Sequence, residues 1–257
     1  MLRLFLLNME DEMSLVEEQL AIDLGCSIGD IRSTANVFIT GQAGWRARNY
    51  AKKPVTIICI NNKVIVRSEN EALTNALRAV WQDLAGEWLG EVRYMNQLIK
   101  ILTEYGYEIN EYYPNFIPRT DLDNTVAVVD EHLQWYDPIE IKQFRGDSRF
   151  SQSFAFSQAD PDKIGVAYIE DGEILAMAGA NPNGKYLWEI GIEIVQANKH
   201  QGLATKLVDA LKQRIIADTD GQIVPYYTTA FTHTKSINVA IRAGFQIGWT
   251  EIAIIEK

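Results

Sequence analysis

The sequence has few of the residues that build cross-links or metal centres. Its 257 residues include two cysteines, Cys26 and Cys59, and three histidines, His132, His200 and His233, which are scattered along the chain. No Cys-x-x-Cys pair and no Cys/His cluster at metal-ligand spacing occurs, so we expect no bound metal. Two thiols in a chain of this length are typical of reduced, buried residues in a cytoplasmic protein.

Basic residues are also in deficit, and long apolar runs are missing. Lys and Arg number 24 against 34 Asp and Glu, which gives a net charge of -10. A protein that reads a phosphate backbone needs a basic face, so we expect no nucleic-acid partner. The apolar run 4–7 is too short for a signal peptide, and no stretch approaches the ~20 apolar residues that span a bilayer. We therefore expect a cytoplasmic protein without a membrane partner.

The sequence does contain the composition of an ordinary globular protein, with 47% hydrophobic and 23% charged residues. Its length suits one large domain or two smaller ones. The first half reads as mostly helical around one hairpin, whose turn is Asn61-Asn62. Gly25 ends the first helix, and Ser27 is a predicted N-cap with Asp30 three residues further on. The predicted helices span 11–24, 70–88 and 91–104, and the hairpin spans 55–67.

The second half alternates strands and helices in mixed order. Asp171-Gly172 predicts a tight hairpin turn. The predicted strands span 126–129, 163–169, 173–179, 186–195, 222–229 and 245–255, and the helices span 202–217 and 235–243. This order predicts an α/β class fold with a mixed α+β sheet. The aromatic segment 107–121, with two prolines, suggests a domain boundary, so we expect an N-terminal α+β domain over 1–120 and a second domain over 121–257. Because the two hairpins echo each other, a degenerate duplication is an alternative origin for the first domain.

The stretch 187–212 carries the clearest chemical signal. A predicted strand runs into a short polar loop, and an amphipathic helix begins at Gly202. Backbone N–H groups at a helix start lack intrahelical partners and, with the helix dipole, make an anion site. Gly202 and the small Ala204 leave room for a close approach. An ordinary strand–loop–helix connection is the alternative interpretation.

The run from Lys199 to Ala204 resembles the acyl-CoA signature of the GNAT superfamily of N-acetyltransferases, Q/R-x-x-G-x-G/A. Ser236-x-x-x-Ala240-x-x-x-Gly244-Phe245 resembles the last helix of that family. The resemblance covers about residues 125–257. Within the family, the chain resembles a Firmicutes-type branch with an additional N-terminal domain. It implies a GNAT acyl-CoA N-acyltransferase fold, with acetyl-CoA as cosubstrate. The implied cofactor-binding residues are Ile192, Ile194, Val195, Lys199, His200, Gln201, Gly202, Leu203, Ala204, Thr205 and Ser236.

Three positions depart from the family pattern. Lys199 replaces the usual Arg or Gln, so a phosphate would meet an ammonium without a bidentate fork. His233 stands where the family often has Asn, and it either lines the cleft or is a polar loop residue. Ala240 occupies the position of the tyrosine that customarily protonates the departing thiolate. The general acid is therefore unassigned by the resemblance.

Acetyl transfer to an amine needs a base, donors for the carbonyl oxygen and a proton for the thiolate. Glu189 and Glu193 share one face of the strand and are both candidate bases, with solvated acids on a polar strand face as the alternative. A β-bulge would shift this facing by one residue. For the carbonyl we expect backbone N–H groups near Ile194 and Val195. Tyr227, or the adjacent Tyr226, is the candidate acid, although one of the two should pack in the core.

We thus expect an acetyltransferase that moves an acetyl group from acetyl-CoA to a primary amine by direct attack in a ternary complex. A non-catalytic acyl-CoA-binding module and a decayed scaffold used for protein interaction are the alternatives. The acidic charge favours a small cationic amine over a protein as acceptor. Trp81 and Trp88 share helical spacing, which indicates core packing or, alternatively, a homodimer face.

Overall fold

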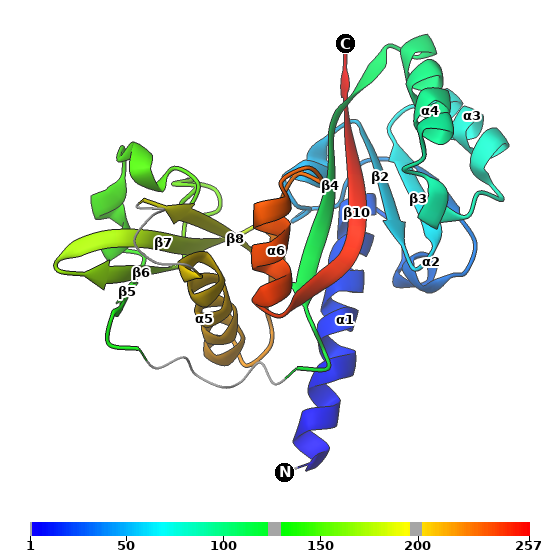
Figure 1. Ribbon diagram of the computed structural model, residues 1–257. Coiled ribbons are helices and arrows are strands. Elements are labelled where there is room, and N and C mark those ends of the chain that lie inside the picture. The colour runs from blue at the N-terminus through cyan, green and yellow to red at the C-terminus, as the bar shows by residue number, and fades with distance from the viewer. Residues whose placement is uncertain (1, 123–129, 196–201) are drawn as a thin grey trace. The chain divides into compact units, whose positions relative to one another are not determined.

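The structure is a computed structural model that describes residues 2–122, 130–195 and 202–257, with side chains from residue 13 onward. Helices and strands are mixed throughout (Figure 1), which confirms the mixed α+β class. The elements are α1 (Leu2–Leu24), α2 (Ile28–Arg32), β1 (Val37–Thr40), η1 (Tyr50–Lys52), β2 (Val55–Ile60), β3 (Lys63–Ser68), α3 (Glu71–Trp81), η2 (Gly86–Trp88), α4 (Val92–Glu104), β4 (Tyr107–Pro118), β5 (Leu133–Tyr136), η3 (Glu140–Phe144), η4 (Ser148–Phe150), β6 (Ile164–Glu170), β7 (Glu173–Pro182), β8 (Leu187–Ile194), α5 (Leu203–Asp218), β9 (Val224–Thr228), α6 (Thr234–Arg242) and β10 (Phe245–Glu256). The strand expected at 126–129 lies outside the described residues.

The chain forms two compact units, and each is built from two segments. We call residues 16–115 with 247–257 the N-terminal unit, and residues 1–15 with 116–246 the C-terminal unit. This division differs from the contiguous domains 1–120 and 121–257 expected from sequence. The reason is β10, whose residues 250–254 pair antiparallel with β2 and so bring the end of the chain into the N-terminal unit.

The C-terminal unit contains a sheet with strands in the order β9-β8-β7-β6-β5. Neighbouring strands are antiparallel except β8 and β9, which are parallel. The β6–β7 turn is Asp171-Gly172, with both residues at positive φ, as the sequence predicts. Helix α5 contacts β6 to β9 and also α6, and together they enclose an apolar core. A second apolar cluster around Phe150 and Phe154 contains Met177 and Ala167.

The N-terminal unit contains the strands β1-β3-β2-β10 in that order, with β1 and β3 parallel. Asn61 and Asn62 form the predicted β2–β3 turn, with φ values of 50° and 62°. Asn tolerates this left-handed region better than most residues, which explains its place in the turn. The amphipathic helices α3 and α4 bury Leu77 and Leu98, among other side chains, in a core with this hairpin.

The largest differences from the predicted organisation are found in three segments. Helix α1 begins at Leu2 rather than at residue 11, because no Gly or Pro interrupts residues 2–24. Helix α3 ends at Trp81 rather than at 88, since Gly86 turns back onto the β2–β3 hairpin and donates its N–H to Asn62 at 2.8 Å. The segment predicted as a boundary, 107–121, is largely the long strand β4. The N-cap prediction is confirmed, because Ser27 and Asp30 form a capping box at α2.

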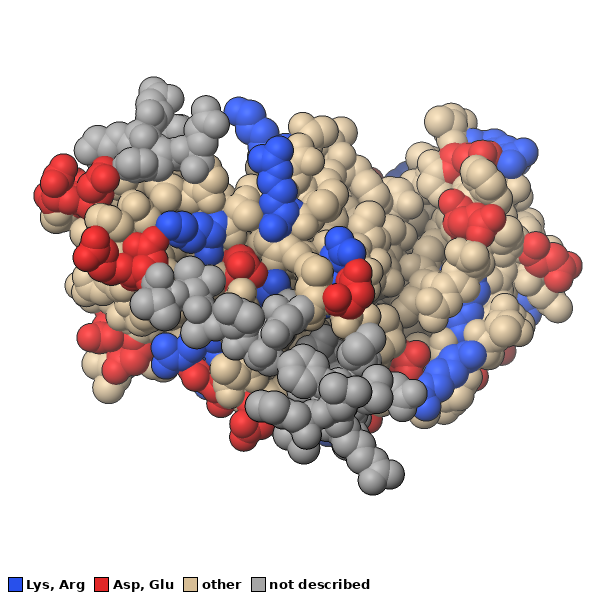
Figure 2. Space-filling model, turned by 60° about the horizontal axis from the view of Figure 1, so that its bottom comes forward, with Lys and Arg blue, Asp and Glu red and all other residues tan. Residues whose placement is uncertain are grey.

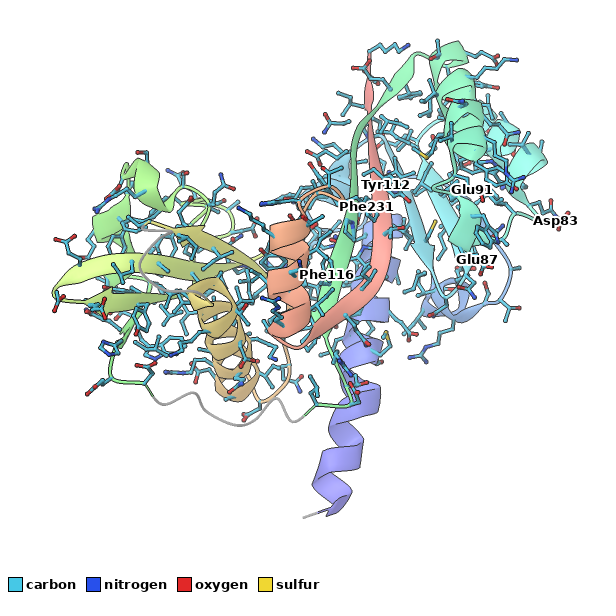
Figure 3. All side chains as sticks on the ribbon, viewed as in Figure 1. Asp83, Glu87, Glu91, Tyr112, Phe116 and Phe231 are labelled. Atoms are coloured by element: carbon cyan, nitrogen blue, oxygen red, sulfur yellow. The ribbon has the colours of Figure 1, made fainter. Side chains whose placement is uncertain are left out.

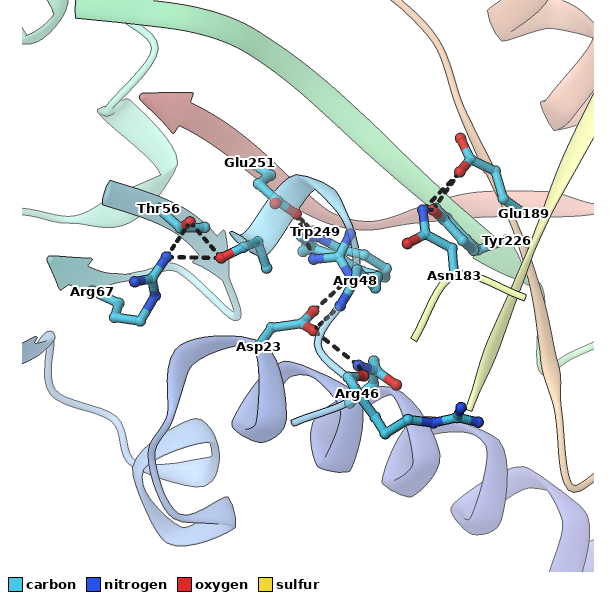
Figure 4. A network of polar contacts seen from close by, with 12 residues as sticks. Asp23, Arg46, Arg48, Thr56, Arg67, Asn183, Glu189, Tyr226, Trp249 and Glu251 are labelled. Carbon is cyan, nitrogen blue, oxygen red and sulfur yellow. Dashed lines mark hydrogen bonds and ion pairs between the residues drawn. The ribbon is translucent and has the colours of Figure 1, made fainter. Parts of the chain in front are cut away.

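A buried charge cluster holds the N-terminal unit together (Figure 4). Arg48 Nε lies 2.5 Å from Asp23 Oδ2, and its Nη2 lies 2.6 Å from Glu251 Oε2. Trp249 donates its indole N–H to the same Glu251 oxygen at 3.1 Å, and the Arg48 guanidinium lies 4.9 Å from the centre of the Trp249 ring. The cluster thereby connects α1, the 40s loop and β10 within this unit. Within the described part of the chain, no helix is long and apolar enough to span a membrane.

Candidate functional site

Strand β8 divides its side chains between the two faces of the sheet, as predicted. Its register with β7 runs without interruption from Ala176–Ile194 to Pro182–Trp188, so no bulge shifts the alternation. Ile192 and Ile194 are half-buried and pack against the core that contains α5. Glu189 and Glu193 therefore share the opposite face with Gly191.

On its other edge β8 separates from β9. The parallel ladder between them comprises Leu187–Val224, Trp188–Pro225 and Glu189–Tyr226, and the described pairing ends there. Strand β8 continues to Ile194, whereas β9 ends at Thr228. The two strands thus form a fork, and Glu189 and Tyr226 are the last pair before it opens.

Along β8, the backbone N–H and C=O groups of every second residue point toward this fork. Val195 donates its N–H to the carbonyl of Leu175 on the β7 side at 2.9 Å, and Val224 on the β9 side donates to Tyr186 at 2.9 Å. Because ladder directions alternate along an antiparallel pair, Ile192 and Ile194 direct their backbone groups away from β7. The Ile194 backbone N–H, which we expect to donate a hydrogen bond to the carbonyl oxygen of the thioester, thus faces the fork. The Val195 N–H does not, because Leu175 accepts it, which corrects the expectation that this N–H is available.

The helix that follows β8 begins at Gly202. This residue has φ +90°, and nothing lies within 4 Å of where a Cβ would stand. Side chains rarely adopt this conformation, so glycine is required by the backbone. The N–H groups of Leu203, Ala204 and Thr205 start α5 and lack intrahelical acceptors. The predicted Lys199, His200 and Gln201 lie outside the described residues.

The first turn of α5 also carries an ion pair. Lys206 Nζ lies 2.5 Å from Asp130 Oδ2. The Lys206 ammonium and the His132 N–H both donate to Asp130 and hold the pKa of its carboxyl below the usual range. Lys206 is therefore already paired with a carboxylate at the end of the helix where an anion would bind.

Glu189 belongs to a polar triad at the vertex of the fork (Figure 4). Its Oε2 accepts hydrogen bonds from the Tyr226 hydroxyl at 2.9 Å and from Asn183 Nδ2 at 2.8 Å. Asn183 Nδ2 also donates to the Tyr226 hydroxyl oxygen at 2.7 Å. Tyr226 and Asn183 are buried, while Glu189 is half-buried. The carboxylate is therefore held by two buried donors on one oxygen.

Glu193 has a different partner. Its Oε2 accepts the backbone N–H of Gln152 at 3.3 Å. The following residue, Ser153, donates its hydroxyl to the Met177 carbonyl at 2.7 Å, and Asp162 accepts the N–H groups of Ala155 and Phe156. Glu193 thus helps to hold the segment 152–156 against the sheet.

Three glycines form the surface of the sheet on which the segment 152–156 packs. Gly165, Gly179 and Gly191 lie opposite one another across β6, β7 and β8. A Cβ at Gly191 would stand 1.9 Å from the Gln152 carbonyl oxygen, and one at Gly179 would stand 2.3 Å from that of Ser153. The absence of side chains in this glycine row lets residues 152–154 lie directly on the sheet.

Tyr227 points to the helix face of the sheet. Its hydroxyl lies 2.5 Å from Ser236 Oγ in the first turn of α6. Its ring is buried between Phe116 and Phe245. Burial raises the pKa of the Tyr227 hydroxyl, and the hydrogen bond with Ser236 opposes this shift. The structure thus brings two of the predicted site residues, Tyr227 and Ser236, into contact.

The remaining predicted residues lie apart from this contact. Ala240 is buried in α6. His233 is exposed at the start of α6, with Nδ1 3.3 Å from Thr229 Oγ1. The sequence carried no signal for Asn183 or Gln152, since both lie in connections whose partners only the register reveals. Trp81 is buried and Trp88 is 51% exposed, so the homodimer face remains a prediction.

Charges on the surface are mixed. Acidic and basic side chains are interspersed over the described part of the face in Figure 2. In the N-terminal unit, Asp83, Glu87 and Glu91 lie along the connection from α3 to α4 (Figure 3), and Glu91 pairs with Arg93 at 2.7 Å. Among the described residues, no three His, Cys, Asp or Glu side chains are grouped as metal ligands.

Residues 129–245 match the model of the acetyltransferase (GNAT) family. The C-terminal unit therefore contains a GNAT-family domain. No curated protein matches the chain.

Several solved structures are similar to the chain. A GNAT-family acetyltransferase from Novosphingobium aromaticivorans is 16% identical over 59% of this chain and 68% of its own, with a TM-score of 0.40. A GCN5-related N-acetyltransferase from Kribbella flavida is 17% identical over 62% of this chain and 63% of its own, with a TM-score of 0.43. A GCN5-related N-acetyltransferase-like protein from Streptococcus suis is 10% identical over 97% of this chain and 100% of its own, with a TM-score of 0.42. This chain thus spans less than two thirds of the Kribbella protein.

Proposed function

We propose that this protein transfers an acetyl group from acetyl-CoA to a primary amine by direct attack in a ternary complex. The observation that carries the proposal is the fork between β8 and β9, which opens after Glu189–Tyr226 and is followed along the chain by the helix start at Gly202. Membership of the domain in the GNAT family supports this chemistry.

The described residues fit acetyl-CoA in two places. The backbone groups of Ile192 and Ile194 face the fork, where the amides of an extended pantetheine arm could pair with them. The N–H groups of Leu203, Ala204 and Thr205, behind a glycine that leaves open space, suit the pyrophosphate. Lys199, His200 and Gln201 join the proposed phosphate site from the sequence motif. Acetyl-CoA supplies the acyl group as an activated thioester.

Glu189 is the proposed base that takes the proton of the amine. Its carboxylate stands at the vertex of the fork and is oriented by two donors. Glu193 is the second candidate, but its carboxylate holds the Gln152 backbone. The Ile194 N–H is the proposed donor to the carbonyl oxygen. Tyr227, paired with Ser236, is the proposed acid for the thiolate, in place of the residue that Ala240 replaces.

The proposed acceptor is a small cationic amine. A net charge of -10 makes the mean potential around the protein negative, which attracts cations. A cytoplasmic location remains a prediction.

The first test measures the melting temperature with and without acetyl-CoA in the wild type, Gly202→Glu and Gly106→Glu. Gly106 is the matched control, because it lies at the surface of the N-terminal unit with φ +81° and open space, as at Gly202. Acetyl-CoA at about 100 times its Kd adds about 2.7 kcal/mol, or roughly 5–10 °C. We expect this shift in the wild type and Gly106→Glu, but not in Gly202→Glu.

The second test screens cationic amines for acetyl-CoA-dependent acetylation. Turnover that requires Glu189 supports the proposal. A thermal shift without turnover of any amine would instead favour a non-catalytic acyl-CoA-binding module. Absence of a shift in the wild type would favour a scaffold that has lost the cosubstrate.

A further inference from the structure

We propose that Asn183 and Tyr226 are positioning residues that hold the Glu189 carboxylate in one orientation at the vertex of the β8–β9 fork. This inference rests on the proposed function, because it assigns Glu189 as the base. The inference goes beyond the proposed function by naming two residues that act on the reaction through Glu189 alone.

The first argument is the geometry of the triad. Three hydrogen bonds of 2.7 to 2.9 Å join the three side chains, and two of them end on the same Glu189 oxygen. A carboxylate accepts and does not donate when ionised, and both partners offer it a donor.

The second argument is burial. Tyr226 is 0% exposed and Asn183 is 3% exposed, so their polar atoms cannot turn to water when Glu189 moves. A rotation of Glu189 away from them would leave two buried donors without this acceptor, which is costly. The arrangement therefore restricts the carboxylate to one position.

The third argument is the place of the triad in the sheet. Tyr226 is the residue directly across the parallel ladder from Glu189, and this is the last pair before the strands separate. Asn183 follows β7, and its N–H donates to the Leu187 carbonyl at 2.9 Å, which fixes the start of β8. Rigid backbone thus holds both partners on either side of Glu189.

The test compares Tyr226→Phe and Asn183→Ala with the wild type, using Tyr136→Phe as the control. Tyr136 is a buried tyrosine of the same unit, on β5. We expect kcat to fall about 10- to 100-fold in both triad variants, with an unchanged Kd for acetyl-CoA. Tyr136→Phe should move neither quantity.

A double-mutant cycle separates action through Glu189 from an independent role. In a Glu189→Gln background, Tyr226→Phe should change kcat by less than about twofold. A further loss as large as in the wild type would overturn the proposal, because Tyr226 would then act on its own. Full activity of Glu189→Gln would instead remove the proposed base itself.

A measurement without turnover keeps the two failures apart. In protein labelled with carbon-13 glutamate, the carboxyl signal that disappears in Glu189→Gln reports the surroundings of the Glu189 carboxyl at a single pH. We expect Tyr226→Phe and Asn183→Ala each to shift that signal, because the carboxyl loses one hydrogen-bond donor, whether or not an acceptor has been found. An unchanged carboxyl signal in both triad variants would overturn the positioning role.

Discussion

Two adjacent tyrosines on β9 serve opposite faces of the same sheet. Tyr226 donates to Glu189 on one face, and Tyr227 contacts Ser236 on the face covered by α5 and α6. Strand alternation makes this division unavoidable. The proposed base, Glu189, and the proposed acid, Tyr227, therefore lie on opposite faces, so that one proton would leave the amine to Glu189 while a different proton reaches the thiolate from Tyr227.

For Tyr227→Phe we expect kcat to fall about 10- to 100-fold, because the proposed acid loses its proton. Burial raises the pKa of Tyr227 above its ordinary value, so the wild-type hydroxyl stays protonated as the pH rises toward 10. The Tyr227-dependent part of kcat should therefore persist at alkaline pH and decline only above about 10. Measuring kcat from neutral to alkaline pH in both proteins checks this. Equal kcat values would show that the thiolate leaves without Tyr227.

The two cysteines should take no part in acyl transfer. Burial raises the pKa of Cys26 to about 11 and that of Cys59 to about 12. The reactive thiolate is therefore scarce at neutral pH, and labelling by iodoacetamide should rise about tenfold per pH unit until the pH approaches 11. Both thiols are free.

The matching activity measurement uses the Cys26→Ala/Cys59→Ala double variant. Its kcat should stay within about twofold of the wild type, since the proposed attack is direct and needs no covalent intermediate. Denatured protein serves as the labelling control, because both thiols then react at their ordinary rate. An acetylated cysteine in protein quenched during turnover would contradict direct transfer.

Much of the site could be predicted at the scale of single residues, and part of it could not. The side-chain alternation of β8 follows from a local rule, and the structure confirms it. Gly202 has a φ of +90°, a conformation that favours glycine, whereas its role in binding stays a prediction. Asn183 could not be predicted, because its contact with Glu189 depends on how β7 and β8 pair. The same register directs the Val195 N–H to the Leu175 carbonyl on β7, and no local sequence pattern predicts this hydrogen bond.

At the scale of elements, the glycine row explains why the segment 152–156 can lie flat on the sheet. The three glycines stand 12 to 14 positions apart in sequence and become neighbours only through strand register. Hairpins were predictable because Asn61-Asn62 and Asp171-Gly172 adopt positive φ, a local property. The strand β4 was missed because its prolines argue against regular structure.

Gly191→Ala should destabilise the protein by about 1–3 kcal/mol, since the new methyl group overlaps the Gln152 carbonyl oxygen. The melting temperature should fall by roughly 2–12 °C. Gly29→Ala is the control, because Gly29 lies at the surface in α2 and a Cβ there meets only ordinary contact with Ser27. Thermal unfolding of both variants tests whether the segment 152–154 packs directly on Gly191. If Gly191→Ala melts like Gly29→Ala, the segment 152–154 does not press on β8.

At the scale of the whole molecule, the N-terminal unit is closed by the end of the chain. Residues 247–257 return to pair with β2, so neither half of a chain cut at residue 120 contains all of that unit. No sequence signal marks this return, because β10 reads as the last strand of the second domain. The long-range contact that holds β10 in this unit is the ion pair of Glu251 with Arg48, which also pairs with Asp23.

Glu251→Ala should therefore destabilise the protein far more than a change at the neighbouring chain end. Glu251 is 4% exposed, and its loss leaves the Arg48 charge and the Trp249 N–H without this acceptor. Breaking a buried pair by removing one partner costs about 3–5 kcal/mol. The control is Glu256→Ala, an exposed glutamate on the same strand, which should stay within about 0.5 kcal/mol of the wild type. Chemical denaturation followed by tryptophan fluorescence measures the stability of both variants. If the two variants unfolded alike, the cluster would not be what fastens β10, and the pairing with β2 alone would have to hold the end of the chain in the N-terminal unit.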